Sequence, residues 1–327
     1  MKAPKFWTVR RPNFIARALQ PIGWLYGEAA ASRMTKPGRR AAAPVVCVGN
    51  FVAGGAGKTP TALALARMLI AQRRRVGFLS RGYGGASRAE PVEVDPNAHS
   101  AAMVGDEPLL LARVAPCWVG EDRVRSARLA VEAGADALIM DDGLQNPALA
   151  KDLALAVVDG ETGFGNGLCL PAGPLRAPLA AQLRLVAGLI VVGGDEAAVG
   201  DISRQAPGKT LLRANLEPDA FAAAPLIGRE VVAFAGIARP EKFYATLRRV
   251  GAQIVATRDF PDHHLYKPRE IAALREEATR RGALLATTEK DAVRLSPREA
   301  RSIVTLPVTL RFEDPAAARA MLAGAFS

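Results

Sequence analysis

Residues 45–59 read VVCVGNFVAGGAGKT. The apolar first part predicts a buried strand, the glycines predict a loop, and the closing Gly-Lys-Thr predicts the start of a helix that continues from Pro60 to Leu69. Glycines allow backbone N–H groups to turn towards phosphate oxygens, and a helix start adds unpaired N–H groups and a partial positive charge. The stretch therefore predicts a phosphate-binding P-loop.

The P-loop pattern assigns roles to its last residues. Lys58 is expected to reach the β- and γ-phosphates of a nucleotide, and the Thr59 hydroxyl is expected to bind Mg²⁺. The strict pattern G-x-x-x-x-G-K-S/T requires glycine where this chain has Val52, so the glycines at 54 and 55 must supply the flexibility. A chance glycine loop is the alternative, and the strand and helix beside it count against it. The expected nucleotide-binding residues are Gly54, Gly55, Ala56, Gly57, Lys58, Thr59 and Pro60.

The length and composition indicate a folded chain with room for two α/β domains. Its 327 residues are 50% hydrophobic, which excludes a disordered chain. The three cysteines lie far apart and match no zinc or redox spacing, so they fit a reducing cytosol. The formal net charge is +11, and residues 1–40 hold nine Lys and Arg and one Glu, a balance of +8. The near-neutral remainder, without a recognition motif, argues against a nucleic-acid partner.

The basic N-terminal segment, residues 1–40, is also rich in large apolar side chains. Ile15, Leu19, Ile22 and Tyr26 fall on one face of a helix. Polar residues interrupt the stretch, so no run approaches the ~20 apolar residues that span a membrane, and no signal-peptide pattern follows. The segment is typical of an amphipathic helix at the interface of an anionic membrane. The alternative is a helix that packs on the body through this apolar face.

Strands and helices alternate in two series after the P-loop. The first series predicts a parallel sheet with helices on both faces. The second begins near Val231 and predicts a smaller α/β unit, with the Pro- and Ala-rich stretch 218–228 as the boundary. We therefore expect an N-terminal interface segment over 1–40, a P-loop domain over 41–217 and a smaller α/β domain over 228–327. The apolar strands of the first series are expected at 76–79, 117–119, 137–140, 153–158 and 189–192.

Acidic and imidazole side chains at three places are candidates for chemistry. The strand 137–140 ends at Asp141 and Asp142, where P-loop proteins place the acid that holds Mg²⁺, although many strands end in Asp for turn chemistry. Asp106 and Glu107 open a helix, so they are either catalytic acids or an N-terminal cap with a first-turn acid. His263 lies in a loop, where it either handles protons or makes loop hydrogen bonds.

Short polar and glycine-containing blocks recur along the chain besides the P-loop. They are Gly49-Asn50, Ser80-Arg81-Gly82-Tyr83-Gly84-Gly85, Gly105-Asp106-Glu107-Pro108, Asp141-Asp142-Gly143-Leu144-Gln145, Pro174-Leu175-Arg176, Asp262-His263 and Thr288-Glu289-Lys290-Asp291. Together with the P-loop, and in this order, they resemble the tetraacyldisaccharide 4′-kinases, or lipid A 4′-kinases. The resemblance runs from the N-terminal segment to about residue 294, and the missing first P-loop glycine is a trait of that family.

The resemblance implies ATP-dependent phosphorylation of the 4′-hydroxyl of a tetraacylated glucosamine disaccharide 1-phosphate in lipid A biosynthesis. It implies ATP and Mg²⁺ as cofactors, and a peripheral or monotopic enzyme on the cytoplasmic face of the inner membrane of a Gram-negative bacterium. The basic N-terminus would attract anionic lipid by about 1 kcal/mol for each Lys or Arg near the surface.

The resemblance also implies roles for single residues. Asp106 matches the family's base, which takes the proton of the sugar hydroxyl, and His263 matches its dyad partner, although the adjacent His264 leaves open which imidazole is used. Arg176 and Arg123 match arginines that meet the substrate or the transferring phosphoryl group, with a solvated surface charge as the alternative. Glu289, Lys290 and Asp291 match a family block in the second domain, and the residues alone predict a strand-end loop that faces the cleft and can touch the nucleotide. The residues that match positions holding or orienting the metal are Thr59, Glu107, Asp141 and Asp142.

A membrane-recruited P-loop ATPase switch of the ParA/MinD type is the alternative function. That group has a lysine directly before the double glycine of its P-loop, where this chain has Ala53. A switch also needs neither an acceptor base nor a second α/β domain carrying a histidine. Both features favour the kinase.

Overall fold

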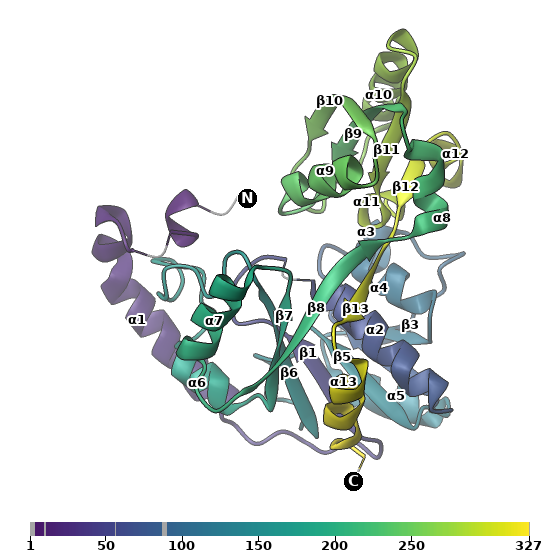
Figure 1. Ribbon diagram of the computed structural model, residues 1–327. Helices are drawn as coiled ribbons and strands as arrows, with labels where there is room; N and C mark the ends of the chain where they lie inside the picture. The colour runs from purple at the N-terminus through teal and green to yellow at the C-terminus, as the bar shows by residue number, and fades with distance from the viewer. Residues whose placement is uncertain (1–3, 10, 56, 87–89, 327) are drawn as a thin grey trace.

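The computed structural model describes residues 4–9, 11–55, 57–86 and 90–326. In these residues it contains a nine-stranded sheet unit, a four-stranded sheet unit and a long N-terminal helix. Figure 1 shows the small unit above the large sheet and the N-terminal helix along one side of that sheet. The α/β fold expected from the sequence, with a P-loop domain, a smaller α/β unit and an N-terminal helix, is thereby confirmed.

The large sheet is parallel except at its two edges. Its strand order is β13-β8-β7-β6-β1-β5-β2-β4-β3, and the edge pairs β13–β8 and β3–β4 are antiparallel. β1 lies in the middle, so the loop that follows it emerges at the carboxyl edge, where open α/β sheets bind ligands. The strands are β1 (Val45–Gly49), β2 (Val76–Ser80), β3 (Val92–Glu93), β4 (Cys117–Val119), β5 (Ala137–Asp141), β6 (Leu153–Asp159), β7 (Gly188–Val192), β8 (Thr210–Pro218) and β13 (Val308–Phe312).

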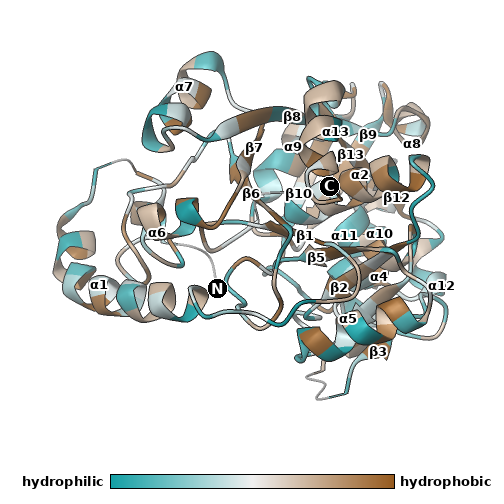
Figure 2. Ribbon diagram, turned by 90° about the horizontal axis from the view of Figure 1, so that it is seen from below, coloured by the Kyte–Doolittle hydropathy of each residue, from teal (hydrophilic) through white to brown (hydrophobic). Residues whose placement is uncertain are grey.

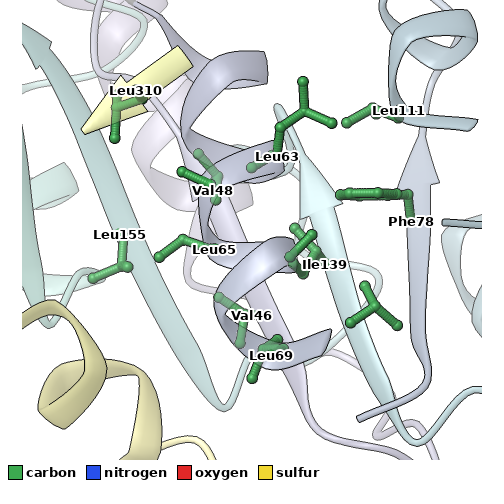
Figure 3. Packing of buried hydrophobic residues seen from close by; sticks show 14 of the residues in the cluster. Val46, Val48, Leu63, Leu65, Leu69, Phe78, Leu111, Ile139, Leu155 and Leu310 are labelled. Carbon is green, nitrogen blue, oxygen red and sulfur yellow. The ribbon is translucent and has the colours of Figure 1, made fainter. Parts of the chain in front are cut away.

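Helices bury both faces of the large sheet. Alternate residues of β1 point to opposite faces, so Val46 and Val48 belong to one buried cluster and Cys47 to the other. Figure 3 shows the first cluster, in which Leu65 and Leu69 of α2 lie among side chains of the neighbouring strands. The helices of this unit are α2 (Lys58–Ala71), α3 (Ala101–Val104), α4 (Asp106–Ala112), α5 (Arg123–Glu132), α6 (Leu179–Arg184), α7 (Glu196–Gln205) and α13 (Pro315–Ala323).

The small unit is a parallel sheet in the order β10-β9-β11-β12. One face is covered by α9, whose Tyr244 and Leu247 are buried, and the other by α10, whose Ile271 and Leu274 are buried. The strand–helix alternation expected from about Val231 is therefore present. The elements are β9 (Glu230–Ala235), α9 (Pro240–Arg249), β10 (Gln253–Asp259), α10 (Pro268–Arg280), β11 (Leu284–Thr288), α11 (Glu289–Ala292), α12 (Pro297–Ala300) and β12 (Val304–Leu306).

The chain crosses between the two units twice, on adjacent strands. β8 leads up to the small unit and ends at Pro218, and β13 leads back from Val308, which pairs with Pro218 in antiparallel register. Between β8 and β9 the chain forms α8 (Ala220–Ala223) and the 3₁₀ turn η2 (Ala224–Leu226). The sequence assigned all of 228–327 to the smaller domain, and this is corrected here: β13 and α13 pack with the large unit, where Leu310 and Leu322 join its core.

The N-terminal helix α1 (Phe14–Met34) follows the 3₁₀ turn η1 (Lys5–Trp7) and packs through its smallest side chains. Gly23 and Gly27 approach Cys169 so closely that a Cβ would lie 2.7 Å from its carbonyl oxygen and 2.8 Å from its Sγ, respectively. The apolar face expected from the sequence does not pack on the body, because Ile15 and Ile22 are 52% and 56% exposed. Figure 2 shows α1 at the edge of the molecule with apolar and polar positions interspersed along it.

Candidate active site

The P-loop has the geometry of a phosphate cradle at the start of α2. Gly57 has φ +87° and caps the helix, a conformation that favours glycine, and Lys58 is the first helical residue. Pro60 lies in the first turn, where a missing N–H costs little. Val52 bridges to Leu175 and the Ala53 N–H donates to the Pro174 carbonyl at 2.7 Å. The loop is therefore anchored by backbone pairing at the position where the strict pattern has glycine.

Two consecutive aspartates lie beside the P-loop, at the end of β5. The Thr59 hydroxyl donates to Asp141 Oδ2 at 3.1 Å, and Asp141 Oδ1 is buried without a hydrogen-bond partner among the described residues. Asp142 has φ +52°, a conformation rare for a residue other than glycine, and this strain turns its carboxylate towards the Lys58 Nζ at 3.6 Å. Burial raises the pKa of Asp141 to about 6. A buried carboxylate oxygen without a partner, next to a hydroxyl, suits Mg²⁺.

Arg176 completes this cluster. Its two terminal nitrogens donate to the two oxygens of Asp142 at 2.9 and 3.2 Å, and it also donates to Gln145 Oε1 at 3.1 Å. Burial lowers the pKa of the Lys58 ammonium; it also works to raise the pKa of Asp142, but Lys58 and Arg176 outweigh it and hold that pKa below its usual value. The cluster thus combines two cations with acids, as a site for a metal-bound polyphosphate requires.

Asp106 and His263 meet at the junction of the two units. Asp106 opens α4 of the large unit and is 2% exposed, and His263 lies in the loop after β10 of the small unit. The His263 Nδ1 lies 3.1 Å from each carboxylate oxygen of Asp106. His263 has φ +58°, so the loop is held in a strained conformation that presents this ring. The structure brings together two residues that lie 157 positions apart.

The small unit supplies further cations to the acids of α4. The Arg294 Nε donates to Asp106 Oδ2 at 2.8 Å, and the Lys290 Nζ lies 2.7 Å from Glu107 Oε1. Burial works to raise the pKa of Asp106, but the hydrogen bond with His263 and the charges of Lys290 and Arg294 hold it well below its usual range. Burial raises the pKa of Glu107 to about 7, and its Oε2 has no hydrogen-bond partner within the part of the chain that the structure describes.

His264 faces away from this junction. Its Nε2 lies 2.9 Å from Glu270 Oε2, and its ring stacks on Phe260 with centroids 4.9 Å apart. Both partners belong to the small unit. The question that the sequence left open, which of the adjacent imidazoles faces Asp106, is answered by this geometry in favour of His263.

Arg123 lies apart from the two clusters. It is 2% exposed, and its Nη1 donates to the main-chain carbonyls of Ser80, at 2.9 Å, and of Gly120. Burial lowers its pKa to about 10. The solvated surface charge considered from the sequence is therefore wrong for Arg123. Its contacts join the end of β2, where the segment 81–85 leaves the sheet, to Gly120, which directly follows β4.

Sequence reasoning missed Arg294. No role was expected three positions beyond Asp291, where Arg294 lies in the turn that follows α11 and its side chain reaches Asp106 and Asp291. Within the block 288–291, Glu289 lies 3.5 Å from Arg113 and Lys290 pairs with Glu107, both of the large unit. Asp291 is fully buried inside the small unit. Two of the three charged residues of the block therefore contact the large unit, and they lie in the short helix α11 where a loop was expected. The expected contact with the nucleotide stays a prediction.

A sequence model of the family described as Tetraacyldisaccharide-1-P 4′-kinase matches residues 15–327. The chain belongs to this family. Relatives named tetraacyldisaccharide 4′-kinase include one from Methylobacterium sp., 56% identical over 326 residues, covering 99% of this chain and 97% of the relative. Another, from Gluconacetobacter diazotrophicus, is 51% identical over 322 residues, covering 98% and 97%.

The fold also matches a solved member of the family. A crystal structure described as the "apo" form of LpxK from Aquifex aeolicus in complex with ATP superposes with a TM-score of 0.76 at 26% identity. The match covers 96% of this chain and 100% of that one. The family expected from the sequence blocks is confirmed, and the ParA/MinD-type switch is not favoured.

Proposed function

We propose that this chain transfers the γ-phosphoryl group of ATP to the 4′-hydroxyl of a tetraacylated glucosamine disaccharide 1-phosphate. The observation that carries the proposal is the pairing of two clusters at one edge of the large sheet: Lys58 with Asp142, and Asp106 with His263. The two clusters are electrostatically coupled. The charge of Glu107 works against the burial that lowers the pKa of Lys58, and the charge of Lys290 works against the burial that raises the pKa of Asp141. Such a pairing joins a phosphate cradle to a base for the acceptor.

The phosphate side of the site is held by the P-loop. Its backbone N–H groups and the Lys58 ammonium bind the β- and γ-phosphates, and Arg176 lies where it can meet the transferring group. Thr59 and Asp141 would hold Mg²⁺, with Asp142 and Glu107 orienting its ligands. Mg²⁺ held by these residues would offset the negative charge that develops on the phosphate oxygens. Ala56 lies outside the described residues.

The acceptor side of the site is Asp106. Its carboxylate stays ionised at neutral pH, because His263, Lys290 and Arg294 favour the charged form. It accepts the proton of the 4′-hydroxyl as the oxygen attacks the γ-phosphorus, and His263 is the dyad partner that helps to keep the carboxylate ionised. A weak base suffices, because bond formation to the attacking oxygen lags in a loose phosphoryl-transfer transition state.

The helix α1 supplies the contact with the membrane that holds the lipid substrate. It packs on the body through Gly23 and Gly27, while Phe14, Trp24 and Leu25 are 85%, 63% and 63% exposed. None of the helices in the described residues is long and apolar enough to span a bilayer. A helix with exposed large apolar side chains and flanking basic residues lies in the interface plane of an anionic membrane. We place it on the cytoplasmic face of the inner membrane, where ATP is present.

The deciding experiment is phosphoryl transfer from labelled ATP to the purified disaccharide 1-phosphate in detergent, with Lys58→Ala as the inactive control. We expect label on the sugar with the wild-type chain and a loss of about 10²-fold or more with Lys58→Ala. ATP hydrolysis that requires only anionic vesicles, without label on the lipid, would indicate a switch instead. If the disaccharide stays unlabelled with both the wild-type chain and Lys58→Ala, the proposed kinase activity is refuted.

The membrane contact is tested by vesicle sedimentation. Replacing Phe14, Trp24 and Leu25 with serine is preferable to deleting α1, because deletion would also expose the surface that Gly23 and Gly27 cover. We expect the triple variant to lose binding to phosphatidylglycerol-containing vesicles while it keeps its affinity for ATP. Phe221→Ser removes a 90% exposed ring on α8 and serves as the matched control. Equal sedimentation of the triple variant and wild type would place the anchor elsewhere.

A further inference from the structure

Arg294 is the buried side chain through which the small unit holds Asp106. It is 1% exposed, and its Nε donates to Asp106 Oδ2 at 2.8 Å while its Nη2 contacts the same oxygen. Its Nη1 donates to the Gly236 carbonyl at 2.7 Å and to Asp291 Oδ1 at 2.8 Å. Every nitrogen of the guanidinium group therefore has an acceptor, one in the large unit and two in the small one.

The small-unit end of this contact is rigid. Asp291 is fully buried, and its Oδ1 also accepts the Gly236 N–H at 2.9 Å and the Tyr266 hydroxyl at 2.7 Å. Its Oδ2 accepts the Thr288 hydroxyl at 2.6 Å. Because these hydrogen bonds tie Asp291 to β9, β11 and the loop before α10, the guanidinium is fixed in the frame of the small unit.

Without Arg294, few contacts inside the large unit hold the rotation of the Asp106 carboxylate. The carboxylate turns about its Cβ–Cγ bond, and its donors inside the large unit amount to the Glu107 N–H, 3.0 Å from Oδ1, among the hydrogen bonds of the described residues. The remaining groups that face it are the Glu107 carboxyl of the large unit, and His263 at 3.1 Å and Lys290 at 3.9 Å of the small unit. His263 is shared equally between both oxygens, so it does not select one. Arg294 does, because it binds Oδ2 alone.

We propose that Arg294 is a positioning residue for phosphoryl transfer, which fixes the rotation of the Asp106 carboxylate and so presents Oδ1 to the acceptor hydroxyl. It acts from the small unit, so the base is oriented only when the two units are in register. This inference rests on the role of Asp106 proposed above. A lysine cannot replace the arginine fully, because one ammonium cannot make the planar fork of contacts to Asp106, Gly236 and Asp291.

The test is steady-state kinetics of Arg294→Lys and Arg294→Met, each in the wild-type chain and in Asp106→Asn. We expect Arg294→Met to lower kcat by about 10- to 100-fold, with the KM values for ATP and the disaccharide unchanged, because positioning is lost and binding is not. The kcat of Arg294→Lys should lie between the kcat of Arg294→Met and that of the wild-type chain. In the Asp106→Asn background neither substitution should lower kcat further, since groups that act as a unit are not additive.

A matched control separates positioning from stability. Arg258→Met breaks another partly buried ion pair of the small unit, that of Arg258 with Glu277 at 2.7 Å, and should keep the wild-type kcat. If Arg294→Met does not fold, Arg294→Lys, which keeps the charge, decides alone. Wild-type kcat in the Arg294 variants, or an equal loss in both Asp106 backgrounds, overturns the inference. A wild-type chain that transfers no phosphate refutes the proposed function instead.

Discussion

Two of the polar junctions between the two units differ in burial. At the first, Asp106 of the large unit contacts His263 and Arg294 of the small unit, and Asp106 and Arg294 are 2% and 1% exposed. At the second, Asp159 of the large unit accepts from Arg239 and Lys242 of the small unit at 2.6 Å each, and both cations are 36% exposed. In both, the carboxylate lies on the large unit and the cations on the small one.

This difference in burial indicates that the two junctions have different roles. Water and salt reach the cations of the Asp159 junction, so it supplies attraction that is screened over about 10 Å at 0.1 M salt. At the Asp106 junction the side chains of Asp106 and Arg294 are buried, so their hydrogen bonds are little screened and fix atoms in place. We therefore expect the first junction to serve geometry at the proposed reacting centre, and the second to serve the approach of the two units.

The largest effect is expected from removing the base at the buried junction. Asp106→Asn keeps the shape and loses proton acceptance, so kcat should fall by roughly 10²- to 10⁴-fold. ATP binding, measured by calorimetry without the disaccharide, should be retained. Unaltered turnover would show that burial at this junction serves only the fold.

The imidazole at the same junction should give a smaller but coupled loss. We expect His263→Ala to lower kcat by about 10-fold or more, and the Asp106→Asn/His263→Ala double variant to be little worse than Asp106→Asn alone. His264→Ala, whose ring pairs with Glu270 at 2.9 Å away from the junction, is the control and should be mild. Losses that simply multiply would mean that His263 shapes its loop and does not act through Asp106.

At the exposed junction, Asp159→Asn should cost stability rather than chemistry. One carboxylate that accepts from two cations is replaced by a neutral amide, and the cations can be hydrated, so we expect a loss of about 1–3 kcal/mol in the free energy of unfolding. When NaCl is raised from 0.1 to 1 M, the free energy of unfolding should decrease more for the wild type than for the variant. The reason is that the variant has already lost the attraction that salt screens. Parallel salt profiles in thermal or urea unfolding would show that this junction is not electrostatic.

The smallest effect is expected at a third contact between the units, the pair of Arg113 with Glu289 at 3.5 Å. Arg113 is 50% exposed, so the pair should contribute about 0.2–1 kcal/mol. Arg113→Ala should leave kcat unchanged in the transfer assay. A kcat loss as large as that expected for Arg294→Met would remove the distinction between buried and exposed contacts.

Local signals in the sequence predicted most of the fold and the phosphate side of the site. A strand, a glycine loop and Gly-Lys-Thr are contiguous, so the cradle around Lys58 follows from neighbouring residues, and the carboxyl ends of β1 and β5 meet because parallel strands align. Hydrophobic periodicity likewise predicted both strand–helix series. The return of β13 to the large sheet was missed, because a short edge strand carries no mark of which sheet it joins.

What the sequence determined alone was the P-loop, the two α/β series and the family, because each depends on residues close in the chain or on the order of short blocks. The tertiary structure decided which of two adjacent histidines faces Asp106, where Arg123 lies, and that Arg294 binds the proposed base across 188 positions. It also decided that α1 packs through glycines and leaves its large apolar side chains exposed. Such contacts depend on the docking of separate elements, and no local pattern of the chain encodes that docking.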